Sequence, residues 1–236
     1  MYTVGMPKKG FWSPAKHTII WPLLVSSGLS VSLYICRMLG GQSTRYWFLI
    51  WNLFLAWLPL LFAFWLKNYL KENGWFNWKA GILTLLWLGF LPNSFYLVTD
   101  FIHLKNTGEV SLLYDAVMFM SYAWNGLILG FVSVFLVHGE LLKRLRPSLV
   151  SKLILGIFIL CSFAIYLGRY LAWNTWDIVI NPFGIIFDVG NRIVKPASYP
   201  NTFTTTSLFA VVLIAMYYSI YKLIAAIRHS DSLKDI

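Results

Sequence analysis

The sequence predicts an all-α protein, a polytopic transmembrane helical bundle of about six spans with both termini in the cytoplasm. The chain has 236 residues, of which 58% are apolar and only 12% are charged, whereas typical soluble domains carry about 25% charged residues. Several apolar runs reach the roughly 20 residues needed to cross the hydrocarbon core. The runs are long and unbroken, unlike the short alternating strands of a β-barrel. We therefore expect a single integral membrane domain over residues 1–236.

The apolar runs predict helices at about 19–37, 46–67, 79–101, 111–137, 152–171 and 206–227. The first run is longer than the core of a signal peptide and lacks a small-residue cleavage site, so we expect an uncleaved span. The stretch 172–205 is predicted to be an outer loop. Its Gly, Pro and Asn residues, including Asn181-Pro182-Phe183-Gly184, break helices, and a short interfacial helix around Ile185–Phe187 is the most that we expect there.

The distribution of positive charge predicts the orientation of the spans. The two tails and the loops at 67–79 and 137–152 carry thirteen of the 19 Lys and Arg residues, and the alternate connections carry six. Cytoplasmic loops are enriched in Lys and Arg, so both termini are predicted to be cytoplasmic. The connections after the first, third and fifth helices then lie outside the cell.

The formal net charge of +10 indicates lipid rather than nucleic acid as the partner. The positive residues are scattered over the loops without a continuous basic face, which favours topology and contact with the lipid bilayer, including anionic lipid. An envelope substrate is a further partner consistent with an outer site. Cys36 and Cys161 fall inside predicted spans and are interpreted as small core residues. The sequence does not specify an oligomeric state.

Polar islands occur at the predicted outer ends of the third, fourth and fifth helices. An ionisable side chain at mid-bilayer costs roughly 2.5–3.5 kcal/mol on insertion scales, so a cluster of them indicates a site. The island in the third helix contains Asn93, Tyr96, Asp100 and His103. Their spacing confines them to a stripe about 80° wide on an α-helix. Pro92 precedes the stripe and predicts a kink.

The fourth helix places Asp115 about one turn into its apolar run, with Tyr122 and Asn125 on the same stripe. We interpret Tyr122 and Asn125 as interhelical hydrogen-bonding residues and Asp115 as an ionisable site residue. At the end of the fifth helix, Arg169 has two interpretations. It forms an ion pair with Asp100 or Asp115, or it binds an anionic headgroup through its planar guanidinium.

The cytoplasmic end of the fourth helix carries His138 and Glu140 beside Lys143 and Arg144. We interpret them as solvated end-capping residues with a local ion pair, separate from the outer islands.

Together the islands predict a polar, carboxylate-rich pocket at the outer ends of these helices. The candidate catalytic residues are Asp100, His103, Asp115 and Asp177. The candidate substrate-binding residues are Asn93, Tyr96, Arg169, Asn174 and Trp176. Three carboxylates facing one guanidinium in a partly dry space require a raised pKa or a further cation. The cofactor hypothesis is therefore a divalent metal ion held by Asp100, His103 and Asp115, which would activate a water molecule.

Two segments resemble the signature segments of a bacterial membrane family, the domain-of-unknown-function family numbered 1361. They are Leu-Pro-Asn-Ser-Phe-Tyr-Leu-Val-Thr-Asp-Phe-Ile-His-Leu at 91–104 and Gly-Arg-Tyr-Leu-Ala-Trp-Asn-Thr-Trp-Asp at 168–177. The resemblance extends from about the second helix to the sixth. It implies a multi-span protein of the bacterial plasma membrane, but it supplies no activity.

Three functions stay open at this point. The first is a metal-assisted hydrolase or transferase that acts at the outer leaflet. The second is a structural or accessory membrane protein in which the polar islands fasten helices together. The third is transport of an ion or small solute along a path through Asp115, which the apolar run 126–137 of the fourth helix disfavours.

Overall fold

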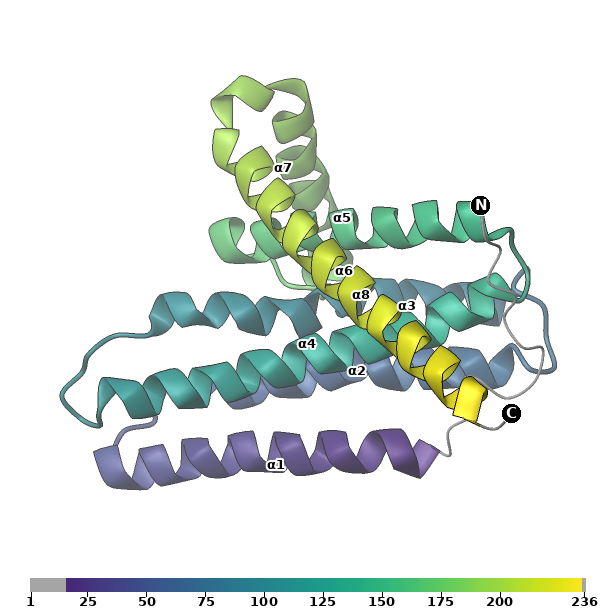
Figure 1. Ribbon diagram of the computed structural model, residues 1–236. Helices are drawn as coiled ribbons and strands as arrows, with labels where there is room; N and C mark the ends of the chain where they lie inside the picture. The colour runs from purple at the N-terminus through teal and green to yellow at the C-terminus, as the bar shows by residue number, and fades with distance from the viewer. Residues whose placement is uncertain (1–15, 235–236) are drawn as a thin grey trace. The chain divides into compact units, whose positions relative to one another are not determined.

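The computed structural model describes residues 16–234, and within this range the chain is helical and contains no strand (Figure 1). The α-helices are α1 (Lys16–Gly41), α2 (Phe48–Tyr69), α3 (Trp78–Tyr96), α4 (Leu112–Leu142), α5 (Pro147–Leu171), α6 (Asp177–Ile180), α7 (Pro182–Val194) and α8 (Pro200–Lys234). Two 3₁₀ helices, η1 (Leu97–His103) and η2 (Pro196–Ser198), complete the described elements. Lys8 and Lys9, counted above for the orientation, lie outside the described residues.

Six of the described helices are long and apolar enough to cross a membrane, which confirms an all-α protein with about six spans, while the cytoplasmic location of both termini stays a prediction. The candidate spans are Thr18–Gly41, Phe48–Tyr69, Trp78–His103, Leu112–Leu142, Pro147–Leu171 and Pro200–Ile227. The fourth continues to Leu142 rather than ending near residue 137. The last begins at Pro200 rather than near residue 206, with the hydroxyl of Thr204 donating to the Pro200 carbonyl (3.1 Å). Such i−4 bonding satisfies a threonine hydroxyl inside a helix.

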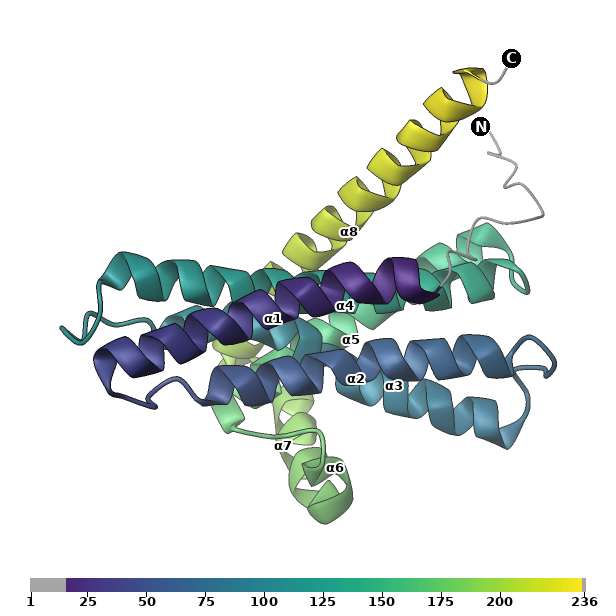
Figure 2. The ribbon, with the colours of Figure 1, turned by 90° about the horizontal axis from the view of Figure 1, so that it is seen from below.

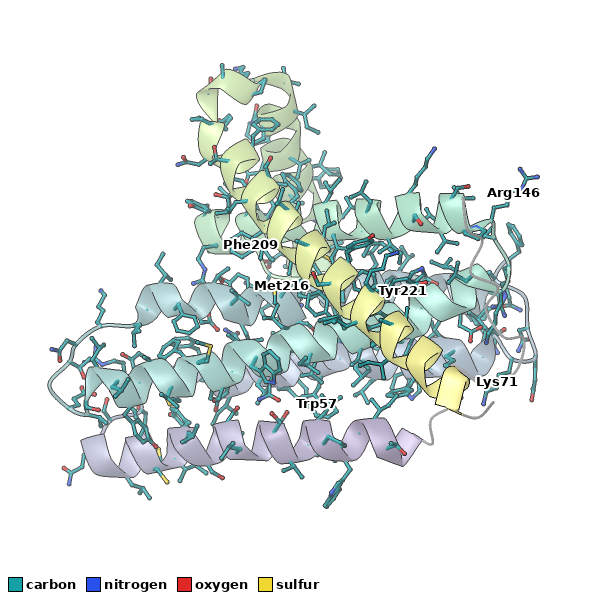
Figure 3. All side chains as sticks on the ribbon, in the orientation of Figure 1. Trp57, Lys71, Arg146, Phe209, Met216 and Tyr221 are labelled. Atoms are coloured by element: carbon teal, nitrogen blue, oxygen red, sulfur yellow. The ribbon has the colours of Figure 1, made fainter. Side chains whose placement is uncertain are left out.

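The chain divides into two compact units, residues 1–144 and 145–236. Unit 1 is an antiparallel bundle in which α4 packs against α1, α2, α3 and η1 (Figures 1 and 2). The 42–47 and 104–111 loops lie at one end of this bundle, which we call the loop end. The 70–77 loop, which includes Lys71 (Figure 3), lies at the other. The single domain predicted over residues 1–236 stays a prediction.

Glycines on α4 allow α3 to approach it closely. A Cβ atom added at Gly126 would overlap the carbonyl oxygen of Ser94, and one added at Gly130 would lie 2.6 Å from the ring of Phe95. This small-xxx-small spacing is typical of helices that pack closely in membranes. Ser94, which follows the predicted kink, also joins α3 to α2. Ser94 donates to the Ala56 carbonyl of α2 (2.9 Å), while Asn93 donates to Phe90 within its own helix (3.1 Å).

A buried polar network joins α1, α2 and α4 near the middle of unit 1. Asn125 donates to the hydroxyl of Ser30 (2.8 Å) and accepts from Ser27 (3.3 Å). Trp57 of α2, which lies beside α1 in Figure 3, donates to Ser27 (3.1 Å). The interhelical role predicted for Asn125 is therefore confirmed. The same role was wrong for Tyr122, whose buried hydroxyl has no hydrogen-bond partner among the described residues.

The third span changes helix type at the loop end. The prediction of continuous α-helix to residue 101 was wrong, because α3 ends at Tyr96 and η1 follows. Thr99 donates to the Tyr96 carbonyl (2.6 Å), three residues earlier. A 3₁₀ helix has three residues per turn, so side chains at i and i+3 are aligned. Asp100 and His103 therefore still share a line, although the α-helical stripe predicted from Asn93 onward is interrupted.

Unit 2 is built on the packing of α5 against α8, with α6, α7 and η2 connecting them. The prediction for residues 172–205 contained too little regular structure, because this segment includes the 13-residue helix α7. Asn181 caps α7 by accepting from the backbone N–H of Gly184 (3.1 Å), and Pro182 occupies the first turn. Both residue types start helices as well as break them. The motif that predicted a helix break is thus a helix start.

The α3–α4 contact yields a first prediction. We expect Gly126→Ala to destabilise unit 1 by about 1–3 kcal/mol, because the added methyl group forces the two backbones apart. The matched control is Gly28→Ala on α1, where an added Cβ meets nothing within 4 Å. Thermal unfolding of the two purified variants in detergent measures the difference. Equal unfolding temperatures for Gly126→Ala, Gly28→Ala and the parent protein would contradict the close packing.

Candidate functional site

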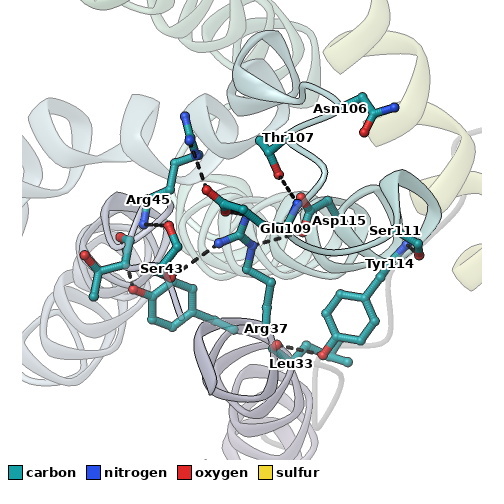
Figure 4. Close-up of polar contacts among 12 residues, drawn as sticks. Leu33, Arg37, Ser43, Arg45, Asn106, Thr107, Glu109, Ser111, Tyr114 and Asp115 are labelled. Carbon is teal, nitrogen blue, oxygen red and sulfur yellow. Dashed lines mark hydrogen bonds and ion pairs between the residues drawn. The ribbon is translucent and has the colours of Figure 1, made fainter. Parts of the chain in front are cut away.

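The loop end of unit 1 is organised around the guanidinium of Arg37, near the end of α1 (Figure 4). Its Nε donates to Oδ1 of Asp115 on α4 (3.2 Å), and its Nη2 donates to Oε2 of Glu109 (2.6 Å). Its Nη1 donates to the Ser43 carbonyl in the 42–47 loop (3.3 Å). The guanidinium also lies 4.6 Å from the ring centroid of Tyr46. One side chain therefore contacts two helices and both loops.

Both members of the central ion pair are buried. Arg37 is 1% exposed and Asp115 is fully buried. Separated from its partner at this depth, either charge would be expensive, because the lipid offers neither counter-ion nor hydrogen bond. The Arg37–Asp115 pair therefore requires α1 and α4 to lie side by side at the loop end. Tyr114 strengthens the same contact by donating to the Leu33 carbonyl of α1 (2.8 Å).

The first turn of α4 sets the position of Asp115. Ser111 caps the helix by accepting from the backbone N–H of Tyr114 (3.2 Å). Asp115 follows within the first turn, where a negative side chain also interacts favourably with the helix dipole. The sequence prediction that Asp115 lies about one turn inside the helix is in agreement with this geometry.

Glu109 extends the network towards the surface. It accepts from Arg45 (3.0 Å) as well as from Arg37. Hydrogen bonds from Arg45 and then Arg37 hold the pKa of Glu109 below its ordinary value of 4.5. Burial raises the pKa of Tyr46, and the nearby charge of Asp115 raises it further. We call Arg37, Arg45, Tyr46, Glu109 and Asp115 the Arg37 cluster.

Asp100 is held by a different helix. It is 1% exposed on η1, and Asn52 of α2 donates to its Oδ2 (2.9 Å). His103, one 3₁₀ turn further on, is exposed and packs edge-on against Phe48, with 5.1 Å between ring centroids. Tyr96 and Asn93 are half-buried on α3. Within unit 1 the predicted site residues therefore differ in exposure and do not form one uniformly buried stripe.

The predicted site residues of unit 2 are held by local contacts. Asp177 begins α6 and accepts from the backbone N–H of Asn174 (2.6 Å). Asn174 is exposed, as is Trp176. Arg169 lies in the last turn of α5. That these residues converge with those of unit 1 stays a prediction.

Unit 2 contains a second buried cation that the sequence analysis treated only as a loop residue. Arg192 of α7 donates to the hydroxyl of Tyr166 (3.2 Å) and to Oδ1 of Asp188 (3.3 Å). It lies 4.7 Å from the ring centroid of Tyr199. Trp173 donates to Oδ2 of the same aspartate (2.8 Å). Burial works against ionisation of Arg192, but its bonds to Tyr166 and Asp188 raise its pKa on balance.

The far end of unit 1 carries another network. Glu140 pairs with Lys143 (2.6 Å) and Arg144 (2.8 Å), which confirms the local ion pair. The solvated setting predicted for His138 and Glu140 was wrong, because both are buried. Arg144 also donates to the Leu70 carbonyl after α2 (2.7 Å). The guanidinium of Arg144 therefore links the Glu140 carboxylate to the end of α2.

Four contributors to the loop end were not predicted from the sequence: Arg37, Arg45, Asn52 and Glu109. Arg37 and Arg45 had entered only the count of positive residues. Arg37 stands within an apolar run, four residues before Gly41, and an ionisable residue inside a span indicates a buried partner. That signal was available from the sequence. Asn52 and Glu109 gave no comparable signal, because their partners lie on other segments.

The Arg37 cluster changes the charge balance on which the metal hypothesis depended. Two guanidinium groups here face the carboxylates of Glu109 and Asp115. Among the described residues, no three His, Cys, Asp or Glu side chains are grouped as metal ligands. Oδ2 of Asp115 is buried without a hydrogen-bond partner in the described part of the chain. Buried polar atoms are normally hydrogen-bonded, so this oxygen has capacity for a water molecule or ligand.

Six long apolar helices and polar side chains paired across them define a multi-span membrane protein. A family model described as protein of unknown function (DUF1361) matches residues 51–223, and the chain belongs to this family. The match includes Asp100, Glu109 and Asp115, whereas Arg37 and Arg45 precede it. No curated protein and no solved structure matches the chain.

The lowered pKa of Glu109 yields a prediction about pH. A carboxylate whose pKa is lower in the folded than in the unfolded state stabilises the fold above its ordinary pKa of 4.5. That contribution is lost as the pH falls through the lower folded value. We expect Glu109→Gln to remove this part of the acid dependence of the unfolding temperature. Glu72→Gln is the matched control, since Glu72 is an exposed glutamate of the 70–77 loop. Identical acid dependence in the two variants would contradict the assignment.

Proposed function

We propose that the protein is a non-enzymatic structural or accessory protein of the bacterial plasma membrane, in which polar clusters fasten the transmembrane helices. In this proposal the loop end of unit 1 faces away from the cytoplasm. The fastened bundle then presents its loops there as a fixed surface, and the cluster residues act on the fold rather than on a substrate.

One observation carries the proposal. Each predicted catalytic aspartate of unit 1 accepts from a side chain on another helix: Asp115 from Arg37 of α1, and Asp100 from Asn52 of α2. Helices in lipid gain no hydrophobic advantage from contacting one another, so packing and interhelical hydrogen bonds hold them together. Contacts of this kind are what a fastening role requires. A catalytic role would instead require that these oxygens be available to a substrate or metal.

The proposed orientation is tested by reporter fusions. We expect an alkaline phosphatase fusion in the 104–111 loop to be active and one in the 70–77 loop to be inactive, because the enzyme folds only outside the cytoplasm. Fusions of green fluorescent protein at the same positions should give the opposite pattern. Phosphatase activity at the 70–77 loop and none at the 104–111 loop would reverse the proposed topology.

The fastening role is tested by removing the buried pair. We expect Arg37→Met to lower the stability of the purified protein by about 3–5 kcal/mol, because it leaves the buried Asp115 without its counter-ion. Arg37→Met combined with Asp115→Leu should recover most of the loss, since apolar side chains replace both charges. Arg45→Met is the matched control. Arg45 is half-exposed and pairs with the same Glu109, and exposed pairs are worth about 0–1 kcal/mol. Unfolding temperature and membrane abundance measure the effects.

The outcome of this cycle distinguishes fastening from a functional site. An unchanged unfolding temperature in Arg37→Met would contradict the fastening role. A double variant no more stable than Arg37→Met would also contradict it, because the loss would then not come from the unpaired charge.

A second candidate function is a metal-assisted hydrolase or transferase at the same end. The observation that favours it is Oδ2 of Asp115, which is buried without a hydrogen-bond partner among the described residues. Elemental analysis of the purified protein beside Asp100→Ala and His103→Ala separates the two proposals. Under the fastening proposal all three contain the same amount of metal, and Asp100→Ala has a lowered unfolding temperature. Metal lost on either substitution, with the unfolding temperature preserved, would favour the enzyme.

The transport hypothesis has less support. Asn125 is the polar residue that would continue a path from Asp115, and its amide bonds instead with Ser30, Ser26 and Ser121. Asp115-dependent flux of an ion into liposomes would be needed to revive it.

A further inference from the structure

Helix α7 of unit 2 has one apolar face that is exposed along its whole length. The exposed side chains are Phe183, Ile186, Phe187, Ile193 and Val194. On an α-helix turning about 100° per residue they fall within an arc about 120° wide. Phe183 is 82% exposed, Phe187 71% and Val194 75%. Large aromatic and aliphatic side chains this exposed, grouped on one helix face, indicate an interaction surface.

The opposite face of α7 bonds with α5 and with the loop that follows α5. Asp188 and Arg192 lie roughly 180° from the centre of the apolar arc, and they bond with Trp173 and Tyr166 respectively. Gly184 lies on the α5 side as well, where an added Cβ would be 2.8 Å from the indole ring of Trp173. The apolar face is therefore turned away from α5, and rotation of the helix would break the Arg192 contacts.

The contact with Tyr166 also fixes the depth of α7. Tyr166 lies inside the fifth candidate span, five residues before its end at Leu171. At 1.5 Å per residue, Arg192 is thus held about 7–8 Å inward from the end of α5. Amphipathic helices at membrane interfaces bury their apolar faces roughly 5–10 Å below the headgroups.

The direction of α7 and its neighbours fit the same position. Figures 1 and 2 show α7 running across the axis of α5 rather than along it. The segment connects the end of one span to the start of the next, so it stays near one membrane surface. Tyr170 at the end of α5 and Phe203 in the first turn of α8 are likewise exposed. Exposed apolar side chains thus occur both on α7 and at the ends of the two spans that it connects.

We propose that α7 is an interfacial helix whose face of Phe183, Ile186, Phe187, Ile193 and Val194 binds the acyl-chain boundary of the surrounding phospholipid. The Arg192–Tyr166 and Trp173–Asp188 contacts hold the helix at this depth. The partner is the bilayer itself, recognised through apolar contact rather than through headgroup charge.

The test measures which phase surrounds the apolar face in the full-length protein. Nitroxide labels are placed on single cysteines at Phe183→Cys, Phe187→Cys or Val194→Cys and compared with Asn174→Cys, an exposed control in the loop between α5 and α6. The exposed Cys36 is replaced by Ser, and Cys161 is retained because it is buried. Each variant is reconstituted in phosphatidylcholine vesicles. Power saturation then compares collisions with oxygen, which concentrates in lipid, and with a water-soluble nickel chelate.

We expect the ratio of oxygen to nickel accessibility to exceed one at the three apolar-face positions and to fall below one at Asn174→Cys. Three positions keep the test decisive if one variant fails to fold. A ratio below one on the apolar face would place it in water and overturn the proposal. Spin–spin broadening that disappears on dilution with unlabelled protein would identify a second copy as the partner, which also overturns it. Low accessibility to both reagents without broadening would show burial against protein, with the same consequence.

Discussion

The arrangement of unit 1 depends on one buried ion pair, Arg37 of α1 with Asp115 of α4. Neither charge is hydrated by solvent, since both side chains are almost completely buried. Either residue can therefore be buried only where α1 and α4 associate at the loop end. Glu109 and the Ser43 carbonyl accept from two further N–H groups of the guanidinium. The 42–47 and 104–111 loops are in this way attached to α1 and α4.

The other polar contacts of unit 1 follow the same rule at different depths. Near the middle, Asn125 of α4 bonds with serines of α1, and at the far end Arg144 donates to the carbonyl of Leu70, which follows α2. Between these levels the contact of α3 with α4 depends on Gly126, which lies against the backbone of Ser94, and on Gly130, which lies against the ring of Phe95. Since apolar side chains are equally soluble in lipid and in protein, close packing and hydrogen bonds decide which helices associate. α4 carries Asn125, Gly126 and Gly130, and Arg144 follows its end, which explains why α4 lies at the centre of unit 1.

The sequence predicted the spans well and the partners of their polar residues poorly, for a physical reason. Span length and apolarity are properties of one segment, so the six candidate spans could be found from the sequence. The stripe on the third helix likewise identified Asp100 as a buried residue. A partner, however, belongs to another segment, and spacing along one helix does not say which. Arg169 was considered for Asp115 because it also lies at an outer helix end, whereas Arg37 satisfies that carboxylate. The prediction of a helix break at Asn181-Pro182 failed for a different reason, because these residues end one helix and begin the next.

A carboxylate in a span is often taken as evidence for catalysis, and Asp115 shows what that inference must first exclude. Its Oδ1 is used by Arg37, and the same guanidinium is shared with Glu109, so the aspartate belongs to a structural unit of several segments. Any chemistry at this end would have to use Oδ2 while leaving the Arg37 contact intact, because losing the contact leaves a buried charge unpaired between α1 and α4. Asp100 is under the same restriction through Asn52, although it lies on a short 3₁₀ helix rather than at the centre of the bundle. Function at the loop end is therefore limited by the need to keep the helices together, and this is the reason that fastening is the first role to assign to its polar residues.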